Sequence, residues 1–241
     1  FAKPEQQING FDPLPIFNCK KSCVMTFKNR AEAGKQLAQA LRHFQNRDGV
    51  VVAVPRGGIE LGYEIADALD LPLDVALTKK LGHPLQPEYA IGAVSLKHRT
   101  VQNTTDIPPE YIESETEKIR ALLNRRKRLY YGDDQPESLT DRIVIIVDDG
   151  IATGQTLLAS IELIAQEQPS RIVVAVPVAS PAAAERIREQ VDEFICLQSP
   201  ENFRAVGQFY KEFAQVSDEQ VVALLQKIRR KDNNSPGTNS H

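Results

Sequence analysis

The stretch from residue 143 to residue 156 constrains the fold of this chain more than any other. It begins with five consecutive β-branched residues and continues with Asp148, Asp149 and a turn that contains Gly154. An uninterrupted β-branched run is typical of a strand buried on both faces, as in a parallel sheet. The two acids then lie at the carboxyl end of the strand, where open α/β sheets bind their ligands. Because the turn leads into an apolar helix-like pattern, its amide groups predict an anion site at the start of a helix.

Strand and helix patterns alternate along most of the chain. Apolar runs predict strands at 50–54, 73–78, 143–147, 171–176 and 193–197. Apolar spacing and capping residues predict helices at 31–41, 59–69, 109–130 and 181–190, and a last one that begins near Ser217. Segments 90–96 and 99–103 are expected to pair as a hairpin. This alternation predicts an α/β fold with a doubly wound, mostly parallel sheet and a small hairpin insert.

A second turn with anion-binding chemistry follows the strand expected at 50–54. Pro55 and Arg56 precede the paired glycines Gly57 and Gly58, and a helix pattern begins after them. Paired glycines let the backbone approach an anion closely, and the arginine supplies a planar donor fork for phosphate oxygens. The alternative is an ordinary glycine-rich turn with a surface arginine.

Bulk composition narrows the class of protein. The chain has 241 residues and a net charge of −3, so no bulk electrostatic attraction to nucleic acid or to an anionic membrane is expected. No apolar run reaches the ~18 residues that a membrane helix needs. Cys19, Cys23 and Cys196 are an odd, small set without a cluster of Cys and His partners, which argues against a zinc site and fits the reducing cytoplasm.

The two ends of the chain differ from the rest. Residues 1–24 show no clear period, and folded-domain patterning begins after Met25, the only methionine. We therefore expect residues 1–24 to be an extension outside the core and residues 25–230 to form one domain. Residues 231–241 are polar and rich in Pro, Gly and Asn, which predicts a disordered tail.

The segment from Asp148 to Thr156 resembles the 5-phosphoribosyl-1-pyrophosphate (PRPP) motif of the type I phosphoribosyltransferases. In that family two acids hold the ribose 2′- and 3′-hydroxyls, and the resemblance assigns this role to Asp148 and Asp149. The loop that cradles the 5′-phosphate then comprises Ala152, Thr153, Gly154, Gln155 and Thr156.

Two further segments extend the resemblance. Pro55–Gly58 is similar to the family's pyrophosphate loop. Lys79 and Lys80, which follow the strand expected at 73–78, stand where members often carry a cation near the pyrophosphate. Spacing does not choose between the two lysines, and we favour Lys80; a solvated strand end is the alternative. Within the family, the chain most resembles a group of bacterial predicted phosphoribosyltransferases. It shares with them the motifs Pro-Arg-Gly-Gly and Asp-Asp-Gly-Ile-Ala-Thr-Gly and the segment at residues 205–210. The resemblance covers about residues 25–225 and implies the family's C-terminal hood.

The resemblance implies an enzyme that displaces pyrophosphate from PRPP with a nitrogen nucleophile. Asp148, Asp149, Arg56 and Lys80 would be its catalytic residues. Mg²⁺ would be the cofactor, held mainly through PRPP, with Asp148 and Asp149 as possible ligands. The expected partners are PRPP and a nitrogenous acceptor, without nucleic acid or membrane, and a homodimer is a possible assembly.

Two other classes of protein share some of these sequence features. A non-catalytic regulator that binds PRPP or a nucleotide on the same fold stays open, although Arg56 and the lysine pair favour an enzyme. A signalling receiver domain fits poorly, because several strand–helix units precede the acid pair whereas a receiver's pair closes its first strand.

The acceptor of the reaction stays open. Ala152 stands where family members that act on hypoxanthine and guanine usually carry an acid, which argues against that specificity. His83 and Glu88, on the loop after the lysines, are candidates for protonating or orienting an acceptor. Four aromatic residues could stack on a flat base or pack in the core: Phe203, Phe209, Tyr210 and Phe213.

Overall fold

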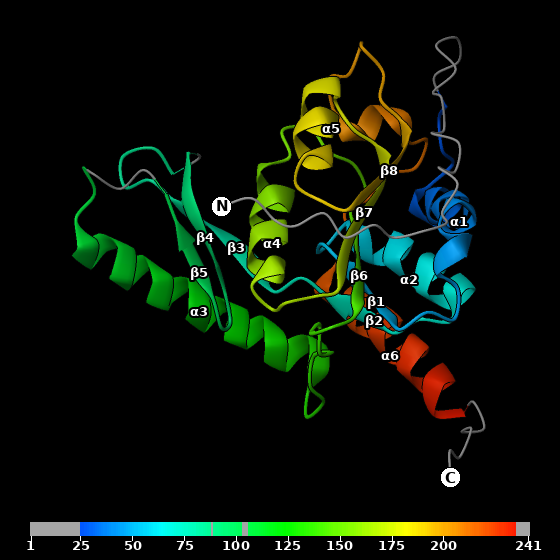
Figure 1. Ribbon diagram of the computed structural model, residues 1–241, viewed down its shortest axis with the longest axis horizontal. Helices are drawn as coiled ribbons and strands as arrows, with labels where there is room; N and C mark the ends of the chain where they lie inside the picture. Colours follow the sequence, from blue (N-terminus) through cyan, green and yellow to red (C-terminus); the bar gives the residue numbers. More distant parts are fainter. Residues whose placement is uncertain (1–24, 88, 103–105, 235–241) are drawn as a thin grey trace, which may run out of the picture.

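A five-stranded parallel sheet forms the centre of the molecule, in the order β2-β1-β6-β7-β8 (Figure 1). The computed structural model describes residues 25–87, 89–102 and 106–234. The strands are β1 (Gly49–Ala53), β2 (Leu73–Val75), β6 (Ile143–Val147), β7 (Arg171–Val178) and β8 (Glu193–Gln198). The strand order reverses between β1 and β6. Their carboxyl ends therefore form the switch point at which doubly wound sheets bind ligands.

Helices cover both faces of this sheet (Figure 1). Successive strand residues point to opposite faces, so Val51 and Ala53 join one core while Val50 and Val52 join the other. The first face carries α1 (Arg30–Ala40), α2 (Gly58–Leu69) and α6 (Asp218–Asn234), and the second carries α4 (Gln155–Ala165) and α5 (Pro181–Arg188). The predicted doubly wound sheet is confirmed, and burial on both faces explains its valine- and isoleucine-rich strands.

A second, antiparallel sheet lies to one side of the first (Figure 1). It consists of β3 (Thr78–Gly82), β4 (Ala90–Ser95) and β5 (Arg99–Val101), and the long helix α3 (Pro109–Tyr131) packs on it. Leu81 and Val94 of the sheet meet Ile119 and Leu123 of α3 in a separate apolar cluster. The predicted hairpin is confirmed, since β4 and β5 pair antiparallel, and so is the predicted helix after residue 108.

The strand expected at 73–78 was wrong in its extent. β2 ends at Val75, and Lys79 and Lys80 lie inside β3 of the second sheet rather than at the end of a parallel strand. Ala76 and Leu77, which connect the two sheets, are themselves buried, 4% and 8% exposed. The apolar run therefore continues through the crossing, and the sequence shows no sign of the change from one sheet to the other.

The helix starts follow signals in the sequence. The Asn29 side chain accepts a hydrogen bond from the Glu32 amide at 3.1 Å and caps α1. At the start of α6, the Gln220 amide donates to the Ser217 hydroxyl and the Ser217 amide donates to the Gln220 side chain, which is the predicted capping box. Two short 3-10 helices, η1 (Arg42–Phe44) and η2 (Val206–Phe209), complete the described elements.

The last helix is longer than expected. α6 continues to Asn234, four residues beyond the predicted domain end at 230. Lys231 helps to hold this extension, because its ammonium group lies 3.0 Å from an Asp67 carboxylate oxygen on α2. The predicted N-terminal extension and residues 235–241 of the predicted tail lie outside the described residues. None of the helices in the described segments combines the length and the apolar character that a membrane crossing needs.

Candidate active site

The two predicted anion-binding turns lie side by side at the switch point of the sheet. β1 and β6 pair in register, with Ala53 opposite Val147. Just beyond them the Val54 amide donates to the Val147 carbonyl at 2.8 Å. A Cβ at Gly58 would come within 2.5 Å of the same carbonyl oxygen, so only glycine permits this approach. The structure thereby brings the turn after β1 next to the acid pair after β6.

Gly57 brings the two turns into direct contact. A Cβ at this position would lie 2.0 Å from Oδ2 of Asp149. The backbone angles of Gly57, φ −60° and ψ −38°, suit any residue, so this glycine is required for space and not for conformation. The peptide bond between Pro55 and Arg56 is cis. The Gly58 amide already donates to the Val54 carbonyl at 3.0 Å, which leaves the Gly57 amide as the one of the pair that can bind an anion.

Burial changes the charge of the acid pair. It raises the pKa of Asp148 well above its usual value, and the neighbouring Asp149 charge raises it further. Burial also raises the pKa of Asp149, while the Arg30 guanidinium opposes this rise. The Asp149 amide donates to Oδ1 of Asp148 at 2.8 Å, which ties the two residues together. Burial thus raises the pKa of both acids, and Asp149 is the one of the two with a cation, Arg30, that opposes the rise directly.

Arg30, the first residue of α1, is a part of this site that the sequence analysis missed. Its Nε and Nη2 both lie 2.9 Å from Oδ2 of Asp149, and its Nη1 donates to the Ala214 carbonyl at 2.7 Å. The guanidinium carbon lies 3.9 Å from the centre of the Phe213 ring. One signal could have found it, because a basic residue at a helix N-terminus opposes the helix dipole and needs a compensating partner.

A pocket of about 360 Å³ opens at this junction. Arg30, Arg56, Gly57 and Asp149 line it together with residues 213–216. The pocket therefore combines two arginines, one acid and a segment that follows the last strand. Arg56 is half-buried on its wall, as expected for a residue that reaches a bound anion.

The aromatic residues of the C-terminal segment divide between core and pocket. Phe209 is buried, and Phe203 packs on it with ring centres 5.5 Å apart. Tyr210 is also buried, and its hydroxyl donates to the Asp149 carbonyl at 2.6 Å. Phe213 alone of the four lines the pocket, and its ring stacks on Tyr210 at 4.9 Å. Most of this set therefore packs in the interior.

The predicted phosphate loop presents its amide groups outward. Gly154 has a left-handed backbone, φ 75°, and α4 begins at the next residue. The Ala152 and Thr153 carbonyls accept hydrogen bonds from Ser180 and Arg186, both at 2.6 Å, which holds the loop on α5. Within the described part of the chain, the amides of residues 152–156 donate to no protein acceptor. Such a row of open donors at a helix start suits a phosphate group.

The lysine pair and the loop after it lie apart from this pocket. Lys79 is exposed, Lys80 is half-buried, and neither lines the pocket. Strand alternation places Lys80 on the same face as Thr78, whose hydroxyl bonds to Ser160 of α4 at 2.7 Å. His83 accepts a hydrogen bond from the Leu85 amide at 3.1 Å. The other acceptor candidate, Glu88, lies outside the described residues.

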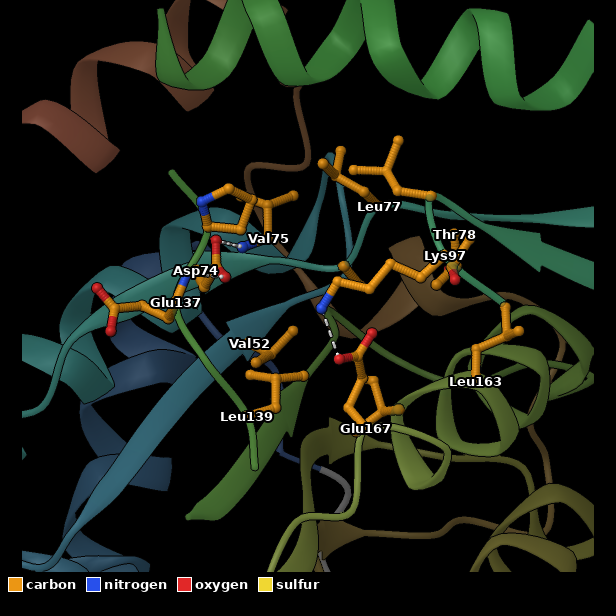
Figure 2. A pocket seen from close by; sticks show the side chains of 15 residues that line it. Val52, Asp74, Val75, Leu77, Thr78, Lys97, Glu137, Leu139, Leu163 and Glu167 are labelled. Atoms are coloured by element: carbon orange, nitrogen blue, oxygen red, sulfur yellow. Dashed lines mark hydrogen bonds and ion pairs between the residues drawn. The ribbon is translucent and has the colours of Figure 1, made fainter. Parts of the chain in front are cut away.

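A second hollow, of about 110 Å³, contains none of the predicted site residues (Figure 2). Its walls are mainly apolar, and the ion pair between Lys97 and Glu167, 2.7 Å long, lies beside them. Asp74 lines it too, but its carboxylate accepts hydrogen bonds from the Val75 and Glu137 amides and from the Tyr131 hydroxyl. Its pKa is raised by burial. These contacts occupy the polar groups of the hollow within the protein itself.

A family model, curated proteins and solved structures all show similarity to this chain. The family model of the phosphoribosyl transferase domain matches residues 27–214. A Mycobacterium tuberculosis (strain ATCC 25618 / H37Rv) protein named "Putative phosphoribosyl transferase" is 38% identical over 210 residues, which are 85% of this chain and 47% of that protein. This chain thus spans about half the length of the curated relatives that it matches. The crystal structure of TT1426 from Thermus thermophilus is similar with a TM-score of 0.76 and 38% identity, over 84% of this chain and 99% of that one.

Proposed function

This chain belongs to the family of phosphoribosyl transferase domains, and from that premise we propose that it transfers a phosphoribosyl group from PRPP to a nitrogen nucleophile. The observation that carries the proposal is the contact between the Asp149 carboxylate and Gly57. It joins a sugar-binding acid pair to an arginine-containing anion turn, and PRPP has both a ribose and a pyrophosphate.

Each part of the site has a role in this proposal. The amides of 152–156 bind the 5′-phosphate, because they are open donors at a helix start. Asp148 and Asp149 accept hydrogen bonds from the ribose hydroxyls. Arg56 and the Gly57 amide bind the pyrophosphate. Lys80 does not line the pocket that contains them, so the role expected for it at the pyrophosphate is not part of this proposal.

The residues present suit Mg²⁺ that is held mainly by the substrate. In the described part of the chain, no three His, Cys, Asp or Glu side chains converge on one point. Asp148 and Asp149 supply hard carboxylate oxygens, and Mg²⁺ commonly takes one or two carboxylates and completes its shell with phosphate and water oxygens. When bound, the ion would neutralise charge on the leaving pyrophosphate.

The reaction breaks the bond between C1 of the ribose and the pyrophosphate oxygen, and forms a bond between C1 and the acceptor nitrogen. The pyrophosphate keeps the electron pair, and the acceptor loses a proton. Positive charge grows on the ribose as the bond breaks, so the negative charge that Arg30 favours on Asp149 stabilises this state. Arg56 and the Gly57 amide stabilise the charge that leaves.

The acceptor is a nitrogenous compound whose class stays open. Ala152 is exposed at the loop and offers no group that could exchange a proton with a base. We therefore expect an acceptor that does not need an acid at this position. His83 remains a candidate for contacting it from the loop after β3.

Calorimetry with PRPP and Mg²⁺, followed by a pyrophosphate-release screen over bases, amines and orotate, tests the proposal. Asp149→Asn and Arg56→Ala should each lower turnover about 100-fold or more, because each removes a contact aimed at developing charge. Arg142→Ala is the control, since Arg142 binds Asp48 and Glu137 just before β6, at the opposite end of that strand. All three variants should keep a cooperative thermal transition.

Three results would contradict parts of the proposal. Wild-type turnover in Asp149→Asn or Arg56→Ala, with a confirmed substrate, refutes the assigned site. Tight PRPP binding without pyrophosphate release for any acceptor favours the regulator over the enzyme. No PRPP binding refutes both.

A further inference from the structure

Arg30 and Asp149 form a largely buried ion pair in which two nitrogens of the guanidinium contact a single carboxylate oxygen. Nε of Arg30 donates a hydrogen bond to Oδ2 of Asp149 at 2.9 Å, Nη2 lies at the same distance from this oxygen, and the side chains are 7% and 15% exposed. Because the guanidinium is rigid and positively charged, this contact restricts the direction of the carboxylate and favours its charged form. The absence of a Cβ at Gly57 leaves the space into which this same oxygen fits.

The second carboxylate oxygen of Asp149 is left open. Oδ1 accepts no hydrogen bond from any other residue in the described segments. The backbone of Asp149 is held as well, because its carbonyl accepts a hydrogen bond from Tyr210 and its amide donates to Asp148. One acceptor position thus remains on a residue whose other polar groups are occupied.

The contacts of Arg30 connect three distant parts of the chain. Its third donor bonds to the Ala214 carbonyl at 2.7 Å, and its plane lies over Phe213, so it links α1 to the C-terminal segment. Both of these residues line the same pocket as Asp149 and Arg56. Arg30 therefore connects the carboxylate of Asp149 to the C-terminal segment that lines the pocket with it.

We infer that Arg30 is a positioning residue, which holds Asp149 so that its open oxygen Oδ1 meets a ribose hydroxyl of PRPP. This inference rests on the proposed function and assigns a role to a residue outside the motifs that suggested it. The opposite role for the same contact is a latch, in which Arg30 competes with the ribose for Asp149. The two roles predict opposite changes in PRPP affinity when Arg30 is replaced.

The test measures the PRPP dissociation constant of the full chain by calorimetry with Mg²⁺. Arg30→Met removes every donor and should weaken PRPP binding about 10- to 100-fold, the usual effect of losing a hydrogen bond to a charged group. Arg30→Lys keeps a positive charge and hydrogen-bond donors but replaces the planar guanidinium with a single ammonium group. Arg30→Lys should recover a large part of the PRPP affinity that Arg30→Met loses. If the Arg30→Met protein does not fold, Arg30→Lys serves as the test variant in its place.

Two controls separate positioning from general stability. Arg142→Met removes an arginine that also binds two carboxylates and two backbone carbonyls, far from the pocket, and should lower the melting temperature without changing PRPP affinity. Phe213→Leu removes the ring under the guanidinium and leaves the contact with Asp149. It should weaken PRPP binding much less than Arg30→Met.

Each outcome decides between the alternatives. Weak binding in Arg30→Met with recovery in Arg30→Lys supports the inference. Unchanged affinity overturns it, tighter binding identifies a latch instead, and an equal loss in Phe213→Leu shows that Arg30 acts only through the C-terminal segment. If the wild-type chain binds no PRPP, the proposed function fails and the role of Arg30 in it fails too.

Discussion

Substitution of Gly57 by alanine tests the central geometry of the site with a single methyl group. The added Cβ would lie 2.0 Å from Oδ2 of Asp149, whereas nonbonded heavy atoms of this kind come to rest at about 3.5 Å. The carboxylate or the turn must therefore retreat by more than about 1 Å. Because the backbone angles of Gly57 suit alanine, this collision is the only cost of the change.

Gly57→Ala should reduce turnover strongly and reduce the free energy of unfolding only moderately. Overpacking costs about 1–3 kcal/mol, and the reduced freedom of the unfolded chain returns about 0.4–1 kcal/mol. The net loss of about 1–2 kcal/mol lowers the melting temperature by about 2–8 °C in a chain of this length. A displacement of about 1 Å at a reacting centre lowers turnover about 100-fold.

The assay is calorimetry with PRPP and Mg²⁺, together with a thermal melt. Gly62→Ala is the matched control, because its Cβ would meet Leu73 at 3.0 Å and Ala53 at 3.1 Å on the same helix but away from the acids. It should show a similar change in melting temperature and unchanged PRPP affinity. Wild-type PRPP affinity in Gly57→Ala would refute the reasoning, since the Asp149 carboxylate could not then be part of the binding surface.

Two further predictions concern the scaffold. Leu123→Ala empties part of the apolar cluster between α3 and the second sheet and should lower the free energy of unfolding by about 2–5 kcal/mol in urea titrations. Leu129→Ala, on the exposed side of the same helix, should change it by less than about 0.5 kcal/mol, and equal effects would contradict the packing of α3. Burial raises the pKa of Asp74 above its usual value, so the folded chain holds this proton more tightly than the unfolded chain. Its contribution to stability is therefore full below about pH 4, the pKa of an unfolded aspartate, and is lost as the pH rises through the raised pKa, whereas asparagine does not titrate. The destabilisation by Asp74→Asn should consequently be largest near pH 4 and smaller at pH 7, and a cost that is the same at both pH values would contradict the raised pKa.

Much of the fold could be predicted because its signals are local. A buried parallel strand reads as a β-branched run, and a helix start reads as a capping residue such as Asn29 or Ser217. The alternation of these elements limits the topology to a doubly wound sheet, which the structure has. The same alternation predicts that Asp148 and Arg56 lie at one edge, since the carboxyl ends of parallel strands meet there.

The errors arose where a local signal has two meanings. The apolar run from Leu73 to Leu77 looks like one strand because every residue in it is buried, yet the chain leaves one sheet and enters another within it. The paired glycines look alike in the sequence, but in the structure the Gly58 amide donates to the Val54 carbonyl, which the sequence does not indicate. A hydrophobic pattern indicates that residues are buried, but it does not indicate against which strand or helix they pack.

Local signals in the sequence were sufficient to predict most strands and helices in their order, and the edge of the sheet at which the acid pair and the Gly154 turn lie. Packing between distant segments brings Arg30 onto Asp149, makes glycine necessary at position 57, and places the lysine pair in the second sheet. These features differ from the predicted ones in the distance along the chain over which they act. Propensity, capping and turn chemistry act over a few residues, whereas Arg30 and Asp149 are 119 positions apart and meet only because two helices and a sheet pack together.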